Sequence, residues 1–322
     1  MIEITANAAI DAVAPSPSGH PANPGDCGAP ESGAHRNAGQ AAQRRTSVAG
    51  DTYNTAVYLA RSGLPVSYLT RLGDDPASGD ILAALRAENI DTHLVTRWPG
   101  RTAGRYTISN DAGGERSFNY ERAHSPAREC FAQVPDLGNT THFYFSGITV
   151  AITRADHANL VGLLRALRSR NCQILFDPNY RPVLWDSAEQ ARHYLRSVLP
   201  FCSSVFPTLD DEQSLWGSVS AQDCHAFYAG YSIDEIVIKG SALTTHAFSG
   251  SDSVCLQAAP VAAVDTTGAG DAFNAGYIAA RLRGAALQHA VHCAQALAAQ
   301  VVQQHGAILP ATGNGHLSRS TF

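Results

Sequence analysis

Short apolar runs alternate with longer amphipathic segments along most of the chain. The apolar runs of strand length lie at residues 66–72, 142–146, 173–176, 204–206 and 235–238. The segments with apolar residues at helical spacing lie at residues 49–62, 78–88, 154–168, 272–283 and 285–304. Strands that alternate with helices in this way are typical of a sheet with helices packed on its faces. The pattern therefore predicts an α/β fold with a doubly wound, mainly parallel sheet.

The period of the pattern changes to two between residues 97 and 122. Residues 105–109 and 116–120 read as two strands, and a polar stretch around Gly113 and Gly114 separates them. This arrangement predicts a β-hairpin. On the pattern alone, the hairpin would be an edge ribbon.

The two ends of the chain differ in composition from the part between them. Residues 5–47 are dominated by Ala, Pro, Gly, Ser and Asn, with almost no large apolar side chains. Such a segment cannot build a core. We therefore expect residues 1–47 to form a loosely ordered N-terminal segment that begins with the end of a strand at residues 1–4. Residues 311–322 are expected to form a C-terminal tail, and residues 48–310 to form the folded domain.

A glycine-rich turn opens the helix predicted at residues 272–283. It reads Asp-Thr-Thr-Gly-Ala-Gly-Asp-Ala-Phe from Asp265 to Phe273. The first N–H groups of a helix lack partners, and glycines let a ligand approach the backbone, so this turn can bind an anion. The negative charge of Asp271 would not favour a site that only held phosphate. A carboxylate at this position fits a base that takes a proton from a substrate hydroxyl. The alternative is an ordinary glycine turn with an aspartate cap.

Two further polar clusters lie next to predicted helices and strands. Gly50, Asp51 and Asn54 stand at the start of the first predicted helix, where the two side chains are either caps or ligand contacts. The segment from Asp177 to Arg181 follows a buried strand, and the carboxyl edge of a parallel sheet is where α/β folds bind ligands. The planar guanidinium of Arg181 suits a carboxylate or a phosphate. The alternative for the second cluster is a loop that is merely polar.

Charge and composition exclude several classes of function. The 322 residues carry a net charge of −5 and only 16% of them are charged, so no basic surface suited to nucleic acid is indicated. No apolar run approaches the roughly 20 residues of a membrane helix, and the start lacks a signal-peptide layout, so a cytoplasmic protein is expected. The 7 cysteines form no C-x-x-C pair and the 13 histidines form no metal-binding cluster, which argues against a disulfide framework and a structural zinc site.

The string from Asp265 to Phe273 resembles the C-terminal signature of the PfkB (ribokinase-like) family of carbohydrate kinases. The resemblance extends over about residues 48–310. It implies that Gly268, Ala269 and Gly270 form the anion hole for the phosphoryl group in transfer and that Asp271 is the general base. It also implies that Thr266 lies with this turn at the bound nucleotide.

Other segments resemble the sugar-binding part of that family. Gly50, Asp51 and Asn54 match a Gly-Gly-Asp-x-x-Asn segment whose polar side chains bind substrate hydroxyls, with Ala49 in place of the first glycine. The hairpin at residues 97–122 matches the lid over the sugar. The matching lid residues are Tyr106, Tyr120 and Arg122, whereas Asn119 departs from the pattern.

The segment Asp-x-Asn-Tyr-Arg-x-x-Leu-Trp resembles the one in 2-keto-3-deoxygluconate kinases, in which the arginine binds the substrate and the asparagine lies near the nucleotide phosphates. These residues are Arg181 and Asn179 here. Lys239, Gly240 and Ser241 match the nucleotide loop Lys-x-Gly-x-x-Gly, with Ser241 and Thr244 replacing both glycines. Thr208-x-x-Asp211 replaces the usual Asn-x-x-Glu, and Asp211 still offers acidic oxygens to a metal through water.

The resemblance implies an ATP-dependent sugar-acid kinase, and it favours the 2-keto-3-deoxygluconate kinases over the ribokinases and fructokinases of the family. ATP and Mg²⁺ are the implied cofactors, and a monovalent cation is left open. A homo-oligomer with no nucleic-acid or membrane partner is expected. Another sugar kinase, such as a fructokinase, and a catalytically silent sugar-binding protein stay open as alternatives.

Members of that family open with a complete buried strand. Residues 1–4 are therefore expected to be the end of such a strand. Either its missing front exposes a sheet edge, or the gene product begins upstream.

Overall fold

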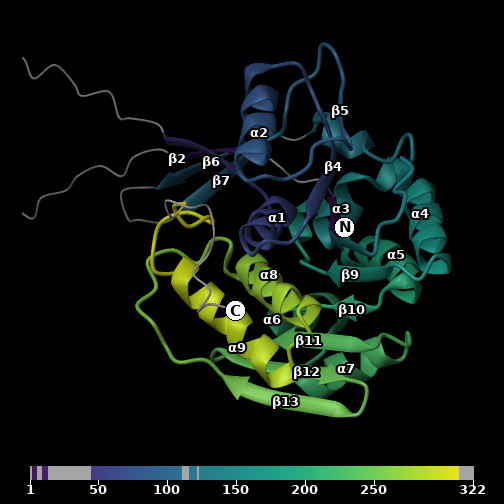
Figure 1. The fold of residues 1–322 in the computed structure, drawn as a ribbon, viewed down its shortest axis with the longest axis vertical. Coiled ribbons are helices and arrows are strands. Elements are labelled where there is room, and N and C mark those ends of the chain that lie inside the picture. Colours follow the sequence, from purple (N-terminus) through teal and green to yellow (C-terminus); the bar gives the residue numbers. More distant parts are fainter. Residues whose placement is uncertain (1, 6–8, 14–44, 111–115, 122, 312–322) are drawn as a thin grey trace, which may run out of the picture.

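The computed structural model describes residues 2–5, 9–13, 45–110, 116–121 and 123–311. Figure 1 shows a broad sheet with helices on both of its faces and a smaller group of strands at one side. The predicted α/β fold is confirmed. Residues 312–322 of the predicted tail at 311–322, and residues 6–8 and 14–44 of the predicted loose segment, lie outside the described residues.

The large sheet has nine strands in the described part of the chain, in the order β13-β12-β11-β10-β9-β8-β1-β4-β5. The strands are β1 (Ile2–Thr5), β4 (Val66–Leu72), β5 (Val95–Arg97), β8 (His142–Ser146), β9 (Gln173–Asp177), β10 (Ser204–Val205), β11 (Glu235–Lys239), β12 (Thr244–Ser249) and β13 (Asp252–Gln257). All neighbours from β11 to β5 are parallel, whereas β12 and β13 pair antiparallel. The mainly parallel sheet was predicted, and its antiparallel edge was not.

Two layers of helices cover this sheet. One face carries α1 (Asp51–Arg61), α2 (Pro76–Ala87), α8 (Ala269–Leu282) and α9 (Leu287–Val301). The other carries α3 (Gly147–Ile152), α4 (His157–Ser169), α5 (Ala188–Val198), α6 (Leu209–Trp216) and α7 (Ala221–Ala229). Along β8, Tyr144 belongs to the first core and its neighbours Phe143 and Phe145 to the second, because successive side chains of a strand point to opposite faces. The mostly apolar strands thus follow from burial on both faces.

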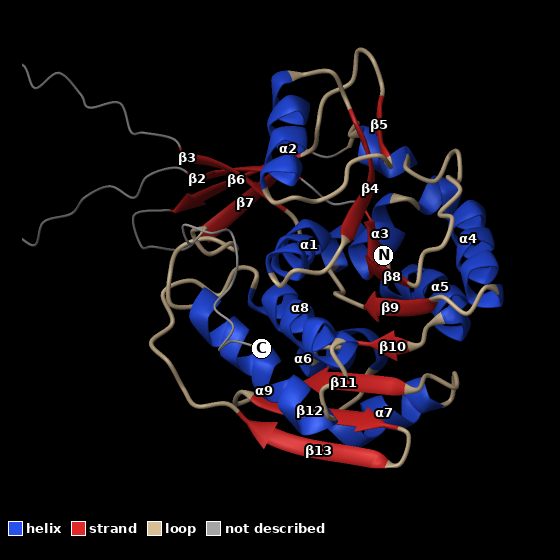
Figure 2. Cartoon of the chain, in the orientation of Figure 1, coloured by secondary structure: helices blue, strands red, loops and turns tan. Residues whose placement is uncertain are grey.

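A separate sheet of four strands lies beside α1 and α2 (Figure 2). Its order is β3-β2-β6-β7, from β3 (Arg45–Ala49), β2 (Ala9–Val13), β6 (Arg105–Asn110) and β7 (Arg116–Glu121). The predicted hairpin is formed by β6 and β7. The other two strands fall inside the segment that was expected to be loose, and β2 pairs with β6. The hairpin is therefore half of a sheet, and not an edge ribbon of the large one.

Strand β1 lies between β4 and β8 and pairs with both. The exposed sheet edge that we considered at this position therefore does not arise. A second difference concerns the helix predicted at residues 154–168. Its first residues, Arg154–Asp156, form a 3-10 turn, and α4 starts only at His157, while the preceding residues form the short helix α3 with Ser146 as its cap.

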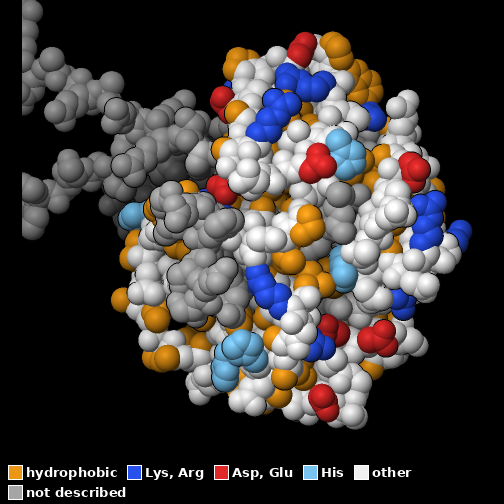
Figure 3. Space-filling model, viewed as in Figure 1, with side chains coloured by type: hydrophobic (Ala, Val, Ile, Leu, Met, Phe, Trp, Pro, Cys, Tyr) orange, Lys and Arg blue, Asp and Glu red, His pale blue; other side chains and the backbone are white. Residues whose placement is uncertain are grey.

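Figure 3 shows basic and acidic side chains interspersed on the face in view. No helix among the described residues has the length and apolar character needed to cross a bilayer.

Candidate active site

The glycine turn ahead of α8 has the geometry that its sequence predicts. Gly268 is the N-cap of the helix and has a left-handed φ of 76°. A Cβ atom there would lie 2.6 Å from the Cβ of Ala307, so only glycine fits. The carboxylate of Asp265 accepts hydrogen bonds from the N–H groups of Thr267 (2.9 Å) and Gly306 (3.0 Å). These contacts fix the turn, in which the N–H of Ala269 also donates to the carbonyl oxygen of Thr266 at 3.2 Å.

Asp271, in the first turn of α8, is enclosed by polar side chains. Its Oδ2 accepts a hydrogen bond from Nδ2 of Asn54 in α1 at 2.8 Å. Burial raises the pKa of this carboxyl well above its ordinary value, and the negative charges of Asp51 and Asp177 raise it further. The hydrogen bond from Asn54 and the positive charge of Lys239 oppose that rise. A carboxyl in this setting has a high affinity for a proton, as a general base needs.

The start of α1 and the loop after β9 meet at the same place. Nδ2 of Asn179 donates to Oδ2 of Asp51 at 2.9 Å, and Asn179 has an unusual φ of 34°. Asn54 is only 3% exposed, and its Oδ1 has no hydrogen-bond partner among the described residues. A buried acceptor of this kind is costly unless a ligand donor fills it, and a substrate hydroxyl would do so. Gly50 is the N-cap residue that brings these side chains to the site.

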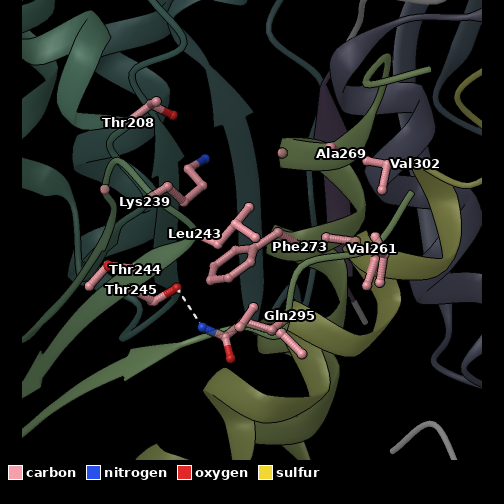
Figure 4. Close-up of a pocket in the computed structure, with 16 residues that line it drawn as sticks. Thr208, Lys239, Leu243, Thr244, Thr245, Val261, Ala269, Phe273, Gln295 and Val302 are labelled. Carbon is pink, nitrogen blue, oxygen red and sulfur yellow. Dashed lines mark hydrogen bonds between the residues drawn. The ribbon is translucent and has the colours of Figure 1, made fainter. Parts of the chain in front are cut away.

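On the other side of the glycine turn lies a cavity of about 290 Å³ (Figure 4). Its lining combines the β11–β12 loop with the start of α8 and the end of α9, through Lys239, Gly240, Leu243, Thr244, Val261, Ala269, Gly270, Phe273 and Val302. Gln295 donates to Oγ1 of Thr245 across its floor at 3.1 Å. The mostly apolar walls and the helix N-terminus suit a ligand with a flat apolar part and an anionic part. Ser241 and Thr266 are exposed and stand outside this described lining.

A buried polar network that the sequence analysis did not anticipate connects the two sides. Nζ of Lys239 donates to Oδ1 of Asn274 at 3.1 Å and lies 3.5 Å from Oδ2 of Asp177. Nδ2 of Asn274 donates to the same Asp177 oxygen at 2.7 Å and contacts the hydroxyl of Tyr144 at 3.1 Å. The signal in the sequence was weak: a polar residue, Asn274, on the otherwise apolar face of a helix.

Arg181 and Asp211 form an ion pair at the rim. Nη1 of Arg181 lies 3.2 Å from Oδ2 of Asp211, and the arginine side chain is 48% exposed. Burial raises the pKa of Asp211, and the charge of Arg181 opposes that rise. Among the described residues no three His, Cys, Asp or Glu side chains gather as a metal cluster. The carboxylate of Asp211 offers oxygen donors to a hard cation, and its contact with a metal through water stays a prediction.

The structure describes only some of the residues predicted to form the lid. Tyr106 and Tyr120 are backbone partners in the pairing of β6 with β7. Arg122 lies outside the described residues. The substrate and nucleotide roles of all these side chains stay predictions, although the structure brings the glycine turn, the start of α1, the β9 loop and Lys239 to one edge of the sheet.

Comparison with known proteins identifies the family. Residues 25–313 match the model of the pfkB family of carbohydrate kinases. The chain is 37% identical over 276 residues to a 2-dehydro-3-deoxygluconokinase of Escherichia coli, which covers 81% of this chain and 89% of the relative. It is 37% identical over 279 residues to the 2-dehydro-3-deoxygluconokinase of Dickeya dadantii, with 81% and 89% covered. The crystal structure of a PfkB protein from Polaromonas superposes with a TM-score of 0.77 at 24% identity, covering 94% of this chain and 95% of the other. The chain therefore belongs to the pfkB family of carbohydrate kinases.

Proposed function

We propose that this enzyme transfers the γ-phosphoryl group of ATP to the primary hydroxyl of 2-keto-3-deoxygluconate, which is also called 2-dehydro-3-deoxygluconate. The observation that carries the proposal is the 37% identity over most of the chain to kinases named for that substrate. The Asp-x-Asn-Tyr-Arg segment supports the same assignment, because Asn179 in this segment bonds to Asp51 at the start of α1 and Arg181 follows two residues later.

The proposal gives each residue of the site a role. Asp271 takes the proton of the substrate hydroxyl, and the N–H groups at Gly268, Ala269 and Gly270 stabilise the negative charge on the phosphoryl group. Asp51 and the unpartnered Oδ1 of Asn54 bind substrate hydroxyls. Arg181, which is half exposed, exchanges its partner Asp211 for the substrate carboxylate.

ATP fits the cavity beside the glycine turn, with its phosphates at the N-terminus of α8 and near Lys239, Gly240 and Asn179. The Mg²⁺ that accompanies ATP would neutralise phosphate charge, and Asp211 would hold it through water. Tyr106, Tyr120 and Arg122 are proposed to close over the sugar. A homo-oligomer is part of the same proposal.

A coupled assay of ADP release across sugars tests the function. The enzyme should turn over 2-keto-3-deoxygluconate with a kcat/KM at least roughly tenfold above that for fructose or ribose, because one charge-assisted hydrogen-bonded pair is worth about 1.5–3 kcal/mol. Arg181→Lys should reduce this preference, since a lysine loses the two-pronged contact. Equal turnover of fructose would replace the proposal with a fructokinase, and no turnover of any sugar would leave a binding protein.

A further inference from the structure

Lys239 is the only lysine among the 23 lysine and arginine residues of the chain. It is the last residue of β11, at the carboxyl edge of the large sheet. Its side chain is 14% exposed, so its charge is mostly removed from bulk water. A compact ammonium differs from the wide guanidinium that the chain uses everywhere else, which suggests a task that needs a point charge.

One side of this ammonium is held in place by buried polar groups. Asn274, which is fully buried, accepts from Nζ at 3.1 Å, and the Asp177 carboxylate lies at 3.5 Å. Asn274 is itself fixed by its bond to Asp177 and its contact with Tyr144. In the described part of the chain, these contacts use two of the three N–H donors of the ammonium.

The other side of the ammonium faces the cavity. Lys239, Ala269 and Gly270 line it together, and Figure 4 shows the lysine side chain extending toward the start of α8. A Cβ atom on Gly270 would lie 3.8 Å from Nζ, so the absent side chain leaves a narrow approach between them. The helix N-terminus and the ammonium thus direct positive charge into one small space.

We propose that Lys239 is a catalytic residue that contacts the γ-phosphoryl group and the β–γ bridging oxygen during transfer, and that Asp177 and Asn274 are its positioning residues. The proposal rests on the kinase function proposed above. In the step, the bond from the γ-phosphorus to the bridging oxygen breaks and a bond to the substrate hydroxyl oxygen forms. The hydroxyl proton passes to Asp271, the electron pair of the broken bond stays on ADP, and Lys239 keeps its proton.

This role explains why the cation is fixed before the ligand arrives. Negative charge on the bridging oxygen grows only as the phosphoryl group leaves, so a preplaced cation stabilises the transition state more than bound ATP. The alternative is a purely structural ion pair that joins β9 to β11. The two roles differ in what ATP does to the lysine and in whether kcat or stability changes.

Amine-selective labelling gives a readout that does not depend on turnover. Treatment with pyridoxal 5′-phosphate and borohydride, followed by peptide mass spectrometry, should label one side-chain amine, Lys239, with the N-terminal amine as an internal reference. ATP should prevent the label at Lys239, ADP should prevent it less, and adenosine or the sugar acid alone should leave it. No label on the free enzyme, or equal protection by adenosine, would overturn the phosphate contact.

Variants test the catalytic part. Lys239→Met should lower kcat by roughly 10²–10³-fold, the range for losing one preorganised transition-state contact, with a much smaller change in the KM for ATP. Lys239→Arg should recover little of the loss. Asp177→Asn should lower kcat less, while ATP still protects the lysine from the label.

Arg281→Met is the matched control, because Arg281 pairs with Glu235 at 2.7 Å at the opposite end of β11. This control should lose stability and keep kcat. If Lys239→Met behaves like Arg281→Met, the lysine is structural and the proposal is wrong. If the wild type phosphorylates no sugar, the proposed function fails, but protection of the Lys239 label by ATP can still be read.

Discussion

At the scale of single residues, neighbouring groups act on the pKa of Asp271 in opposite directions. Burial and the charge of Asp51 raise its pKa and favour its protonated form, while Asn54 and Lys239 favour the carboxylate. Its contact with Asn54 spans 217 positions of sequence. A general base must accept a proton and release it again within each catalytic cycle. Opposing effects on its pKa keep both the protonated and the ionised form accessible.

Replacing Asp271 by asparagine should abolish most turnover. The amide keeps the size of the side chain but cannot accept the hydroxyl proton, so kcat should fall by roughly two to four decades. Binding of the sugar acid, measured by calorimetry, should persist because Asp51, Asn54 and Arg181 remain. Near-normal turnover in this variant would remove Asp271 from the base role.

Replacing Asp51 by asparagine should change the pH dependence. The base works as a carboxylate, so kcat falls as the pH drops through the raised pKa of Asp271. The Asp51→Asn substitution removes a negative neighbour, which lowers that pKa and moves the acid limb of the kcat profile to lower pH. Asp252→Asn, which changes an exposed charge at the start of β13, is the control. An acid limb that stays in place in both variants would contradict the coupling.

The sequence predicted the residues of the site that are close to one another along the chain. The turn from Gly268 to Asp271 and the pair Asp51 and Asn54 each lie within one short segment, where capping and glycine arguments apply directly. The network of Lys239, Asp177 and Asn274 joins three elements through contacts that span 35, 62 and 97 positions. No local pattern shows such a contact, so only the folded chain reveals it.

At the scale of elements, strands and helices with strong apolar patterns were predicted and the weak ones were not. The strands β4, β8, β9 and β11 contribute apolar side chains to the cores on both faces of the sheet and were found from the sequence. Strand β12 has only two buried positions and β13 has none, so the pattern of this antiparallel pair resembles a surface loop. The small sheet was half predicted, because β2 pairs with β6 across a long separation that periodicity cannot show.

Helix α6 carries a buried acid outside the proposed chemistry. Glu212 is fully buried, accepts a bond from the hydroxyl of Tyr228 at 2.9 Å, and has no partner for Oε2 in the described part of the chain. Burial raises its pKa to about 8 from 4.5. The folded state therefore holds this proton where the unfolded chain has lost it, so the group's contribution to stability falls as the pH rises from about 4.5 through 8.

Glu212→Gln should remove that pH dependence. Glutamine resembles the protonated acid, so the variant should match the wild type at pH 5 and should be the more stable of the two at pH 8. The wild-type slope from this group is at most about 1.4 kcal/mol per pH unit. Urea unfolding at both pH values measures the difference, with Glu189→Gln, a change in the first turn of α5, as the control. Equal slopes in wild type and Glu212→Gln would show that Glu212 is charged in the fold.

At the scale of the whole molecule, the site exists because the parallel sheet collects loops at one edge. Segments near residues 51, 177, 239 and 271 are far apart in sequence, and the carboxyl ends of β9 and β11 and the starts of α1 and α8 bring them together. The class of fold could be predicted because alternating strands and helices have few solutions. The place of β1 could not, because four residues carry too little pattern to show which strands they join.

The central place of β1 gives a prediction about the whole fold. Ile4 lies in a strand that pairs with β4 on one side and β8 on the other, whereas Ile10 lies in the small sheet between β3 and β6. Proline has no N–H and cannot complete a ladder in the middle of a sheet. Ile4→Pro should therefore cost about 1–3 kcal/mol for each buried group it leaves unpaired, and the melting temperature should fall sharply. Ile10→Pro should leave the melting temperature nearly unchanged and raise the KM for the sugar acid, since it disturbs only the proposed lid. Calorimetry and steady-state kinetics on both variants measure these effects. A stable Ile4→Pro protein would mean that β1 adds little to the stability of the large sheet. An Ile10→Pro protein that melts at a much lower temperature would mean that the small sheet belongs to the core of the fold.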